Sequence, residues 1–310
     1  NSGREVSDAT YGLMTDRLIP QQQQDLEALR TQLRLQGLQP GTQAYDDCMK
    51  DMMTSQGDVL SGAANQATLT GYNEAFIIEG KIKDELIAKD PKNKEILKPI
   101  LRGRDTRRYY CNFADCWLIN SHNGLKSKGI KRIDIPNDYP LINKYLEQFL
   151  PKAELRQDKG EHWTNLRNCA YLDEIEKQKI VFSEIVSEPQ FYYDTMGYYP
   201  EATVFFITGE KLKYLTALLN SKAVTHVFKK FYAGGELVGK YRYKKAFLEN
   251  LPIPLPDNIV EGKFNTLVDS ILAAKQSNPK ADTSAQEQAI DLMVYKLYEL
   301  TYDEAMIVDP

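Results

Sequence analysis

The sequence predicts an α+β protein in which a central strand-rich region is flanked by helices at both ends. Three observations lead to this prediction. The middle of the chain contains short apolar runs typical of strands, such as "KIVFSEIV" at residues 179–186. Both ends contain apolar residues at helical spacing. With 310 residues, 42% hydrophobic and 26% charged, the chain is long enough for a sizeable core.

The N-terminal segment, residues 1–68, is rich in glutamine and poor in aromatic residues. Its leucines from Leu26 to Leu33 recur at helical spacing, and the Pro40-Gly41 pair marks a turn before a second helix, which predicts a helical hairpin. Residues 29–52 also faintly resemble helical pieces of bacteriophage structural proteins. Two interpretations stay open: a native helical arm, or a foreign segment joined by fusion near residues 64–70.

The remaining chain divides into a central domain at residues 69–256 and a helical tail at 257–310. Within the central domain, residues 139–157 have one apolar helical face, and residues 210–232 predict an amphipathic helix pair. The second helix of the tail is expected to start at Thr283 or Ser284, with Glu287 at capping-box spacing. Further strands are predicted in short apolar runs at residues 74–78, 116–121, 191–195 and 202–208.

Composition argues against several classes of protein. No window approaches eighteen consecutive apolar residues, so we expect no membrane-spanning helix and no membrane partner. Cys48, Cys111, Cys116 and Cys169 have neither CxxC spacing nor paired histidines nearby, which predicts free thiols and no metal site. The start of the chain has neither an initiator methionine nor the apolar core of a signal peptide. We therefore expect a cytoplasmic protein whose sequence is a fragment of a longer one.

Recognisable catalytic motifs are missing from the sequence. It has no glycine-rich phosphate loop and no G-x-S-x-G, H-E-x-x-H or Walker pattern. One nuclease-like string contains Asp257 and Glu261 to hold a divalent ion and Lys263 to hold a phosphate. Its spacing is too short for carboxylates on neighbouring strands, so a loop leading into a polar helix start is favoured. His226 is expected on a helix face, and His162 in a polar loop.

The net charge of −4 conceals an uneven distribution. Residues 80–132 contain 14 Lys and Arg against 6 Asp and Glu, and residues 222–245 contain 7 against 1. Residues 246–310 contain only 4 basic residues against 11 acidic ones. Two basic blocks and an acidic tail predict one positively charged face, which is what binding to phosphates requires.

The first basic block surrounds "LRGRD" at residues 101–105, where Gly103 gives the backbone freedom. Arginine binds phosphate, or guanine in bidentate fashion, and tyrosine hydrogen-bonds to phosphate. The alternative is that some of these arginines form surface ion pairs with Asp84, Asp105 or Asp115. The candidate binding residues of this block are Arg102, Arg104, Arg107, Arg108 and Tyr110.

The second basic block is "GGELVGKYRYKKAF" at residues 234–247. If it is extended, period-two alternation places Tyr241 and Tyr243 on one face and the cations on the other. Its glycines would let the backbone approach a partner closely. A solvated polar hairpin is the alternative. The candidate binding residues of this block are Lys240, Tyr241, Arg242, Lys244 and Lys245.

Several separated segments resemble one family in the same order along the chain. The segments include "TGYNEAFII", "DPKNKEILKPILRGRDTRRYY", "WLINS", "GEHWTNLR", "KQKIVFSEIV" and "RYKKAFLENLPIP". Over roughly 240 residues they resemble the TaqI-like C-terminal specificity domain. That domain is the target-recognition part of adenine-specific DNA methyltransferases and of single-chain Type IIG restriction-modification enzymes, which are bacterial.

The resemblance implies a domain that closes over double-stranded DNA opposite a methyltransferase domain and reads bases in the major groove. It implies that Arg102 and Arg104 face the DNA while Asp105 braces their turn, that Asn73 caps backbone groups, and that Arg167 faces phosphate. The positions that it marks as structural are Gly71, Asn73, Phe76, Gly103, Asp105 and Trp163, the last in the core.

The resemblance also implies S-adenosylmethionine as the cofactor of the parent enzyme, in a domain that this chain does not contain. The sequence has no N-P-P-[YFW] loop for a flipped adenine, and the Gln-rich residues 1–68 stand where the catalytic domain would precede. We therefore expect double-stranded DNA as the partner, with no cofactor and no established catalysis in this chain. The alternative is a protein-interaction module that docks through residues 1–68 and the acidic C-terminal helices.

Overall fold

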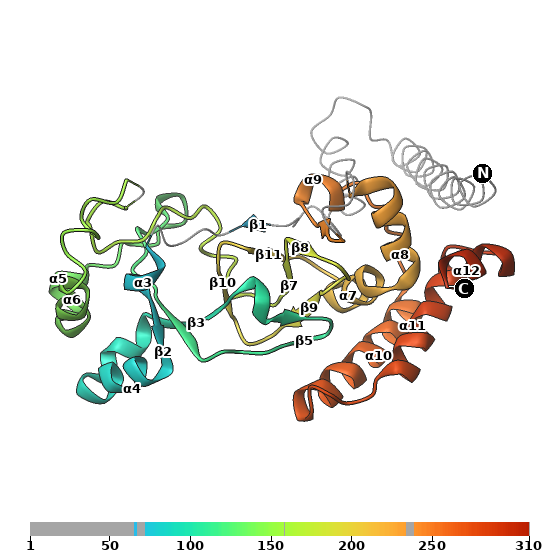
Figure 1. Cartoon of the computed structure of the whole chain (residues 1–310), viewed down its shortest axis with the longest axis horizontal. Helices are drawn as coiled ribbons and strands as arrows, with labels where there is room; N and C mark the ends of the chain where they lie inside the picture. The colour runs from blue at the N-terminus through green and yellow to red at the C-terminus, as the bar shows by residue number, and fades with distance from the viewer. Residues whose placement is uncertain (1–64, 67–71, 158, 234–238, 310) are drawn as a thin grey trace, which may run out of the picture.

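The computed structural model describes residues 65–66, 72–157, 159–233 and 239–309. The predicted α+β class is confirmed, with strands in the middle and helices at the C-terminal end (Figure 1). The helical hairpin expected in residues 1–68 lies outside the described residues, except for the two residues of strand β1 (Asn65–Gln66).

An antiparallel sheet forms the centre of the protein. Its strand order is β1-β11-β7-β9, with β11 at Val204–Ile207, β7 at Lys179–Ser183 and β9 at Tyr192–Asp194. Every residue of β7 and β11 is buried. Because successive side chains of a strand point to opposite faces, this sheet must be covered on both sides.

Helices cover one face of the central sheet (Figure 1). Ile180 and Phe182 of β7 pack there with residues of the C-terminal helices in one core, which we call the helical-side core. Val268 and Val294 contribute to it from the tail. The helices here are α7 (Leu212–Asn220), α8 (Lys222–Val227), α9 (Lys245–Leu248), α10 (Asn258–Ser277), α11 (Ser284–Leu297) and α12 (Tyr302–Val308), with the π-helical turn η4 (Phe228–Tyr232) after α8.

A second four-stranded sheet meets the other face, where Val181 and Phe206 join its core. Its order is β10-β3-β6-β2, in which β10 runs parallel to β3 and the other pairs are antiparallel. Its strands are β2 (Ile77–Glu79), β3 (Leu97–Leu101), β6 (Cys116–Ile119) and β10 (Tyr199–Pro200). The helices beside it are α3 (Asn73–Phe76), α4 (Gly80–Lys89), α5 (Ile135–Asp138) and α6 (Pro140–Glu147), with 3₁₀ turns η1 (Pro91–Glu95) and η3 (Lys126–Lys128).

Two short ribbons carry the basic blocks. One joins β4 (Thr106–Arg107) to β5 (Tyr110–Cys111) and follows the 3₁₀ turn η2 (Gly103–Asp105); the other joins β8 (Ile185–Val186) to β12 (Tyr241–Arg242). The β4–β5 turn places Tyr109 in the left-handed region, at φ 64°. That strain is offset because the Tyr109 ring is buried in the helical-side core.

Two local predictions need correction. Residues 74–78 were expected to be a strand, but the chain forms the helical turn α3 first and the strand begins only at Ile77. In the tail, Thr283 is the residue before α11, and its hydroxyl bonds to the Glu287 carboxylate without capping a backbone N–H. The complete capping box lies instead at the start of α12, between Thr301 and Glu304.

Within the described residues, every helix is too short or too polar to cross a membrane.

Candidate nucleic-acid interface

An ion pair closes the η2 turn: it joins Arg102, the residue before the turn, to Asp105, the last residue of the turn. Arg102 Nε and Nη2 donate to the two carboxylate oxygens of Asp105, each at 2.8 Å, and the Arg102 backbone N–H donates to Asp105 Oδ2 at 3.0 Å. Asp105 is only 4% exposed, so its charge depends on this partner. The hydrogen bond to Asp105 also raises the pKa of the Arg102 guanidinium above its ordinary value. Arg102 is thus occupied in bracing its own turn.

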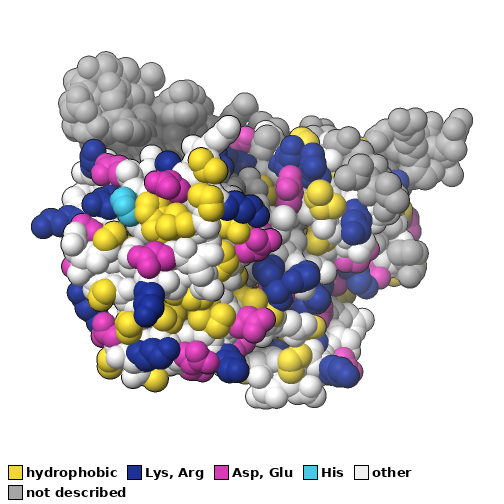
Figure 2. Space-filling view, turned by 60° about the vertical axis from the view of Figure 1, so that its left-hand side comes forward, with side chains coloured by type: hydrophobic (Ala, Val, Ile, Leu, Met, Phe, Trp, Pro, Cys, Tyr) yellow, Lys and Arg dark blue, Asp and Glu magenta, His cyan; other side chains and the backbone are white. Residues whose placement is uncertain are grey.

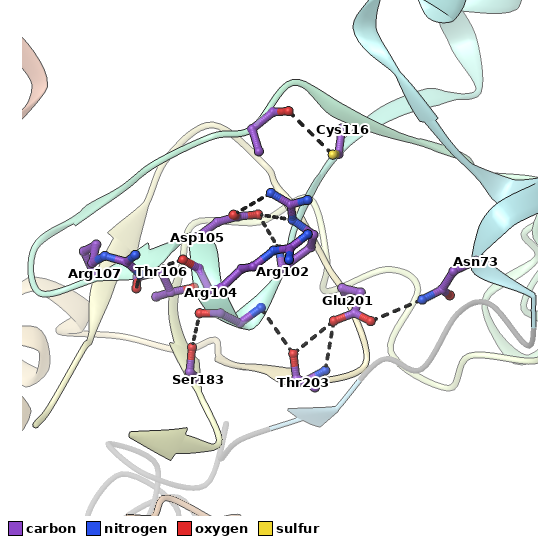
Figure 3. A network of polar contacts seen from close by, with 12 residues as sticks. Asn73, Arg102, Arg104, Asp105, Thr106, Arg107, Cys116, Ser183, Glu201 and Thr203 are labelled. Carbon is purple, nitrogen blue, oxygen red and sulfur yellow. Dashed lines mark hydrogen bonds and ion pairs between the residues drawn. The ribbon is translucent and has the colours of Figure 1, made fainter. Parts of the chain in front are cut away.

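Hydrogen bonds attach the same turn to the central sheet (Figure 3). The Gly103 N–H donates to Thr203 Oγ1 at 3.2 Å, and Ser183 Oγ donates to the Gly103 carbonyl at 2.5 Å. A Cβ atom at Gly103 would lie 2.7 Å from Thr203 Oγ1, so glycine is required by close approach. Thr203 also donates to Glu201, which accepts a bond from Asn73 Nδ2 at 3.3 Å. Asn73 was expected to cap backbone groups, whereas this contact joins its side chain to that of Glu201.

Arg104 and Arg107 lie on the outer side of the braced turn. The Arg104 side chain is exposed, and it has no hydrogen-bond or ion-pair partner within the described residues. Arg107 is half-buried, and its Nη1 donates to the carbonyls of Arg104 and Thr106, both at 2.7 Å. The second arginine of "RGR" therefore keeps its charge available to a partner, while the first does not.

Arg108 points to a different part of the molecule. Its Nε lies 2.5 Å from Glu287 Oε2 of α11, and its Nη1 donates to the Asn220 carbonyl at the end of α7. Adjacent residues of a strand-like ribbon point to opposite sides, which separates Arg108 from Arg107. Arg108 thus ties the β4–β5 ribbon to the C-terminal helices.

The second basic block follows the predicted alternation. Tyr243 is buried, with its ring stacked 4.2 Å from Phe228, and burial raises the pKa of its hydroxyl. Arg242 is directed outward and pairs with Glu184 at 3.3 Å. Tyr241 is half-buried beneath the ammonium of Lys229, 5.1 Å from its ring centre. Lys240 and Lys245 are exposed and Lys244 is half-buried, and none of the three has a hydrogen-bond or ion-pair partner among the described side chains.

The two basic blocks meet at one cleft of about 390 Å³. Arg104 and Arg107 reach it from the first block, and Lys240 from the second. Neither Arg102 nor Arg108 lines it. The expectation that Arg102 and Arg104 share this cleft is therefore corrected for Arg102, whose guanidinium is turned back onto Asp105. Among the described residues, the lining is Gly103, Arg104, Arg107, Ser183, Glu184, Ile185, Val186, Ser187, Gln190, Thr203 and Lys240.

Several cleft residues were not predicted from the sequence. Ile185 belongs to strand β8, and Glu184 directly precedes it. Ser187 and Gln190 lie on the loop that leads to β9. The segment "SEPQ" has no periodicity and no charge run to mark it. Its only signal is its place in the chain, directly after a buried strand, because polar loops next to rigid strands are frequent binding elements.

The other predicted residues are placed as follows. Phe76 is fully buried, and Trp163 is half-buried against the same core as the second sheet. Tyr110 is half-buried, with Lys275 of α10 5.8 Å from its ring centre. Arg167 is exposed in the loop after α6, outside the cleft. Gly71 lies outside the described residues.

The nuclease-like string adopts the favoured alternative, a loop followed by a helix start. Asp257 caps α10 by accepting from the Val260 N–H at 2.7 Å, and Glu261 pairs with Lys211. In the part of the chain that the structure describes, no group of three His, Cys, Asp or Glu side chains is arranged to hold a metal ion. His226 lies in α8, as predicted for a helix-face histidine.

The fold and the site together define the class of protein: it is an α+β domain with a cleft whose cations come from the two basic blocks. Comparison with known proteins identifies the family. The TaqI-like C-terminal specificity domain matches residues 98–253, half of the chain, so the chain belongs to that family.

A solved structure, titled as that of the Type IIL restriction-modification enzyme MmeI in complex with DNA, has a similar fold, with a TM-score of 0.55 and 12% sequence identity. The similarity covers 79% of this chain and 34% of the other chain, so this chain spans about a third of that enzyme.

Proposed function

We propose that this chain is the module that recognises a specific double-stranded DNA sequence for an adenine-specific methyltransferase or a Type IIG restriction-modification enzyme. The observation that carries the proposal is the convergence of both basic blocks on one cleft, where Arg104 and Lys240 have no partner within the described residues. A cation without a partner in its own protein is available to neutralise a phosphate and release the counterion bound there.

The chemistry of the cleft is that of a DNA contact surface. Arg104 and Lys240 supply charge to position a phosphate backbone, and the uncharged residues of the same lining supply groups that can meet base edges. The family membership and the fold shared with MmeI, whose structure is titled as a complex with DNA, support the same interpretation. In the parent enzyme, methyl transfer from S-adenosylmethionine would take place in a domain outside these 310 residues.

Fluorescence anisotropy with the full chain tests the proposal. Binding to a mixed-sequence duplex should be measurable at low salt and should weaken linearly on a log-log plot as salt rises. The double charge reversal Arg104→Glu/Lys240→Glu should reduce affinity at least about tenfold, because it places repulsion at the phosphate contacts.

The control is Lys81→Glu/Lys94→Glu, which makes the same change in net charge at exposed lysines outside the cleft. This control should bind within about threefold of the unmodified chain, because exposed charges beyond about 10 Å from the DNA are largely screened. No binding even at low salt would contradict the proposal. An equal reduction in both double variants would contradict the cleft as the binding site.

A protein-interaction module remains the second candidate function. The observation in its favour is the exposure of large apolar side chains on the two last helices, where Leu292, Tyr302 and Met306 are 60%, 78% and 43% exposed. Size-exclusion chromatography with and without duplex DNA separates the candidates. A stable oligomer whose size is unchanged by DNA and by the Arg104→Glu/Lys240→Glu change would favour the interaction module.

A further inference from the structure

We infer that Gln190 and Ile185 read an A·T base pair in the major groove, so that strand β8 and the loop after it are the base-reading edge of the cleft. This inference rests on the proposed function. It goes further by assigning sequence discrimination to two side chains that the basic blocks do not include.

Some polar side chains of the cleft already have a hydrogen-bond or ion-pair partner within the described part of the protein, and others do not. Ser183 and Thr203 bond to the backbone of Gly103, and Glu184 pairs with Arg242. Gln190 and Ser187 have no hydrogen-bond partner within the described residues, although both line the cleft. Of the two, only Gln190 offers a donor and an acceptor side by side in one plane.

The pairing of β8 with β12 fixes the direction of Ile185. Val186 is opposite Tyr241, and Ile185 is opposite Arg242, so Ile185 and Arg242 share one face of the ribbon. Val186 is buried in the helical-side core, which places Ile185 on the outer face. Ile185 is 36% exposed and lines the cleft, an apolar side chain placed among polar ones.

The backbone next to Gln190 is held firmly. The following residue, Phe191, donates its N–H to Asn220 Oδ1 at 3.2 Å, and its carbonyl accepts from Asn220 Nδ2 at 2.8 Å and from the Tyr109 N–H at 3.1 Å. The preceding Pro189 is buried and restricts the loop further. The backbone that carries a side chain used for readout must be held in this way, because a loosely placed contact discriminates poorly.

The chemistry of this pair of side chains matches one base pair. A glutamine amide bonds in bidentate fashion to adenine N6 and N7, and an apolar side chain contacts the C5-methyl group of thymine. These groups lie on the major-groove edge of the same A·T pair. Arg104 and Lys240, which line the same cleft, would hold the phosphates that set the register.

The experiment is selection of binding sites by the full chain from a randomised duplex library, followed by titrations on the selected site. The selected site should contain a fixed A·T pair. Gln190→Ala should lose the preference at that pair by about 5- to 150-fold while binding non-specific DNA normally. The matched control is Glu188→Ala, an exposed residue of the same loop that pairs with Lys229 and does not line the cleft.

Replacing thymine by deoxyuridine removes one methyl group and isolates the role of Ile185. The unmodified chain should bind the uracil duplex about fourfold more weakly at that pair, and Ile185→Ala should bind both duplexes equally. The inference is overturned if Gln190→Ala selects the same site with the same preference, or if uracil substitution affects both proteins alike. A selected site in which no A·T pair depends on Gln190 would overturn this inference alone. Binding without any sequence preference, or no binding at all, would overturn the proposed function as well.

Discussion

Cations around the second sheet and cations at the cleft differ in whether the protein supplies their counter-charge. Around the second sheet, Lys98 lies 2.8 Å from Glu176, and Lys128 lies 3.4 Å from Asp173. Figure 2, which brings that end of the molecule forward, shows Lys and Arg side chains interspersed with Asp and Glu across the surface. At the cleft, Arg104 and Lys240 have no such partner in the described part of the chain.

The difference shows that a count of basic residues is a poor guide to a polyanion site. Residues 80–132 contain 14 lysines and arginines, yet most of the arginines in "LRGRDTRR" serve the fold. A guanidinium that is already bonded to a carboxylate has its charge largely offset and has fewer N–H donors left for a phosphate. A cation that binds DNA is therefore expected to have no internal partner. Four predictions test this idea, ordered from the most buried ion pair to the cations without a partner.

The strongest partnership is fully buried. Lys179 and Asp194 are both 0% exposed, with Nζ 2.6 Å from Oδ2, and burial lowers the pKa of Lys179. Lys179→Met would leave the Asp194 carboxylate buried without its counter-charge. We expect the free energy of unfolding to fall by about 3–5 kcal/mol, measured by urea denaturation.

The control for this prediction removes both charges. Asp194 accepts the backbone N–H groups of Met196 at 2.8 Å and of Tyr198 at 2.9 Å, and Lys179→Met/Asp194→Asn keeps an acceptor for only one of them. The double variant should still recover part of the missing stability, since no uncompensated charge remains. A double variant as unstable as Lys179→Met would show that the ion pair is not the main cause of the destabilisation.

The next partnership links the β4–β5 ribbon to α11. Arg108 is 31% exposed and Glu287 is 21% exposed, so their contact is partly shielded from water. Arg108→Ala should cost about 1.5–3 kcal/mol of stability, because it removes hydrogen bonds to a carboxylate and to the Asn220 carbonyl. A double-mutant cycle with Glu287→Gln measures their coupling, and additive effects would contradict the link.

A weaker partnership joins Lys98 to Glu176 at the surface. The hydrogen bond from Lys98 is the main cause that lowers the pKa of Glu176 below its ordinary value. A carboxyl group with a lowered pKa in the folded state stabilises the protein above its unfolded pKa of about 4.3, and this contribution disappears as the pH falls through the folded value. Glu176 is 58% exposed, so screening by solvent limits the contribution to less than about 1 kcal/mol.

Lys98→Met should therefore reduce stability slightly at pH 7 and should flatten the fall in stability below about pH 4.3. Thermal unfolding followed from pH 3 to pH 7 measures both effects. The comparison variant is Lys94→Met, an exposed lysine with no ion-pair partner among the described residues. A pH profile unchanged by Lys98→Met would rule out this pair as a source of acid sensitivity.

These cases also show which features the sequence could predict. The alternation in "KYRYK" correctly separates buried Tyr243 from outward Arg242, because period-two geometry is local. The bracing role of Asp105 also follows from local spacing, since it lies three residues from Arg102.

The sequence could not predict which residues meet across the tertiary structure. Arg108 meets Glu287 across 179 positions, and no local pattern distinguishes it from Arg107. "RGRD" allows either arginine to pair with the aspartate, and the sequence does not show that Arg102 is the one that does. Gln190 was missed because its loop has no pattern and acquires significance only where β8 brings it beside the basic blocks.

The smallest effect on stability is expected where no partner exists. Arg104→Ala/Lys240→Ala should leave the free energy of unfolding within about 0.5 kcal/mol of the unmodified chain, since the side chains make no contact that folding needs. The slope of log affinity against log salt should nevertheless become shallower by up to about 1.8, or about 0.9 for each phosphate that is no longer neutralised.

Arg102→Ala is the opposing variant, because it removes one positive charge from the turn that also carries Arg104. It should destabilise the protein by about 1.5–3 kcal/mol by removing the bonds to buried Asp105, and it should leave the salt slope unchanged. If Arg102→Ala instead made the slope shallower by about 0.9, the change expected when one phosphate is no longer neutralised, an internal partner would not prevent a cation from binding DNA. Arg102, which is paired, and Arg104, which is unpaired within the described residues, would then contribute equally to DNA binding from the same turn.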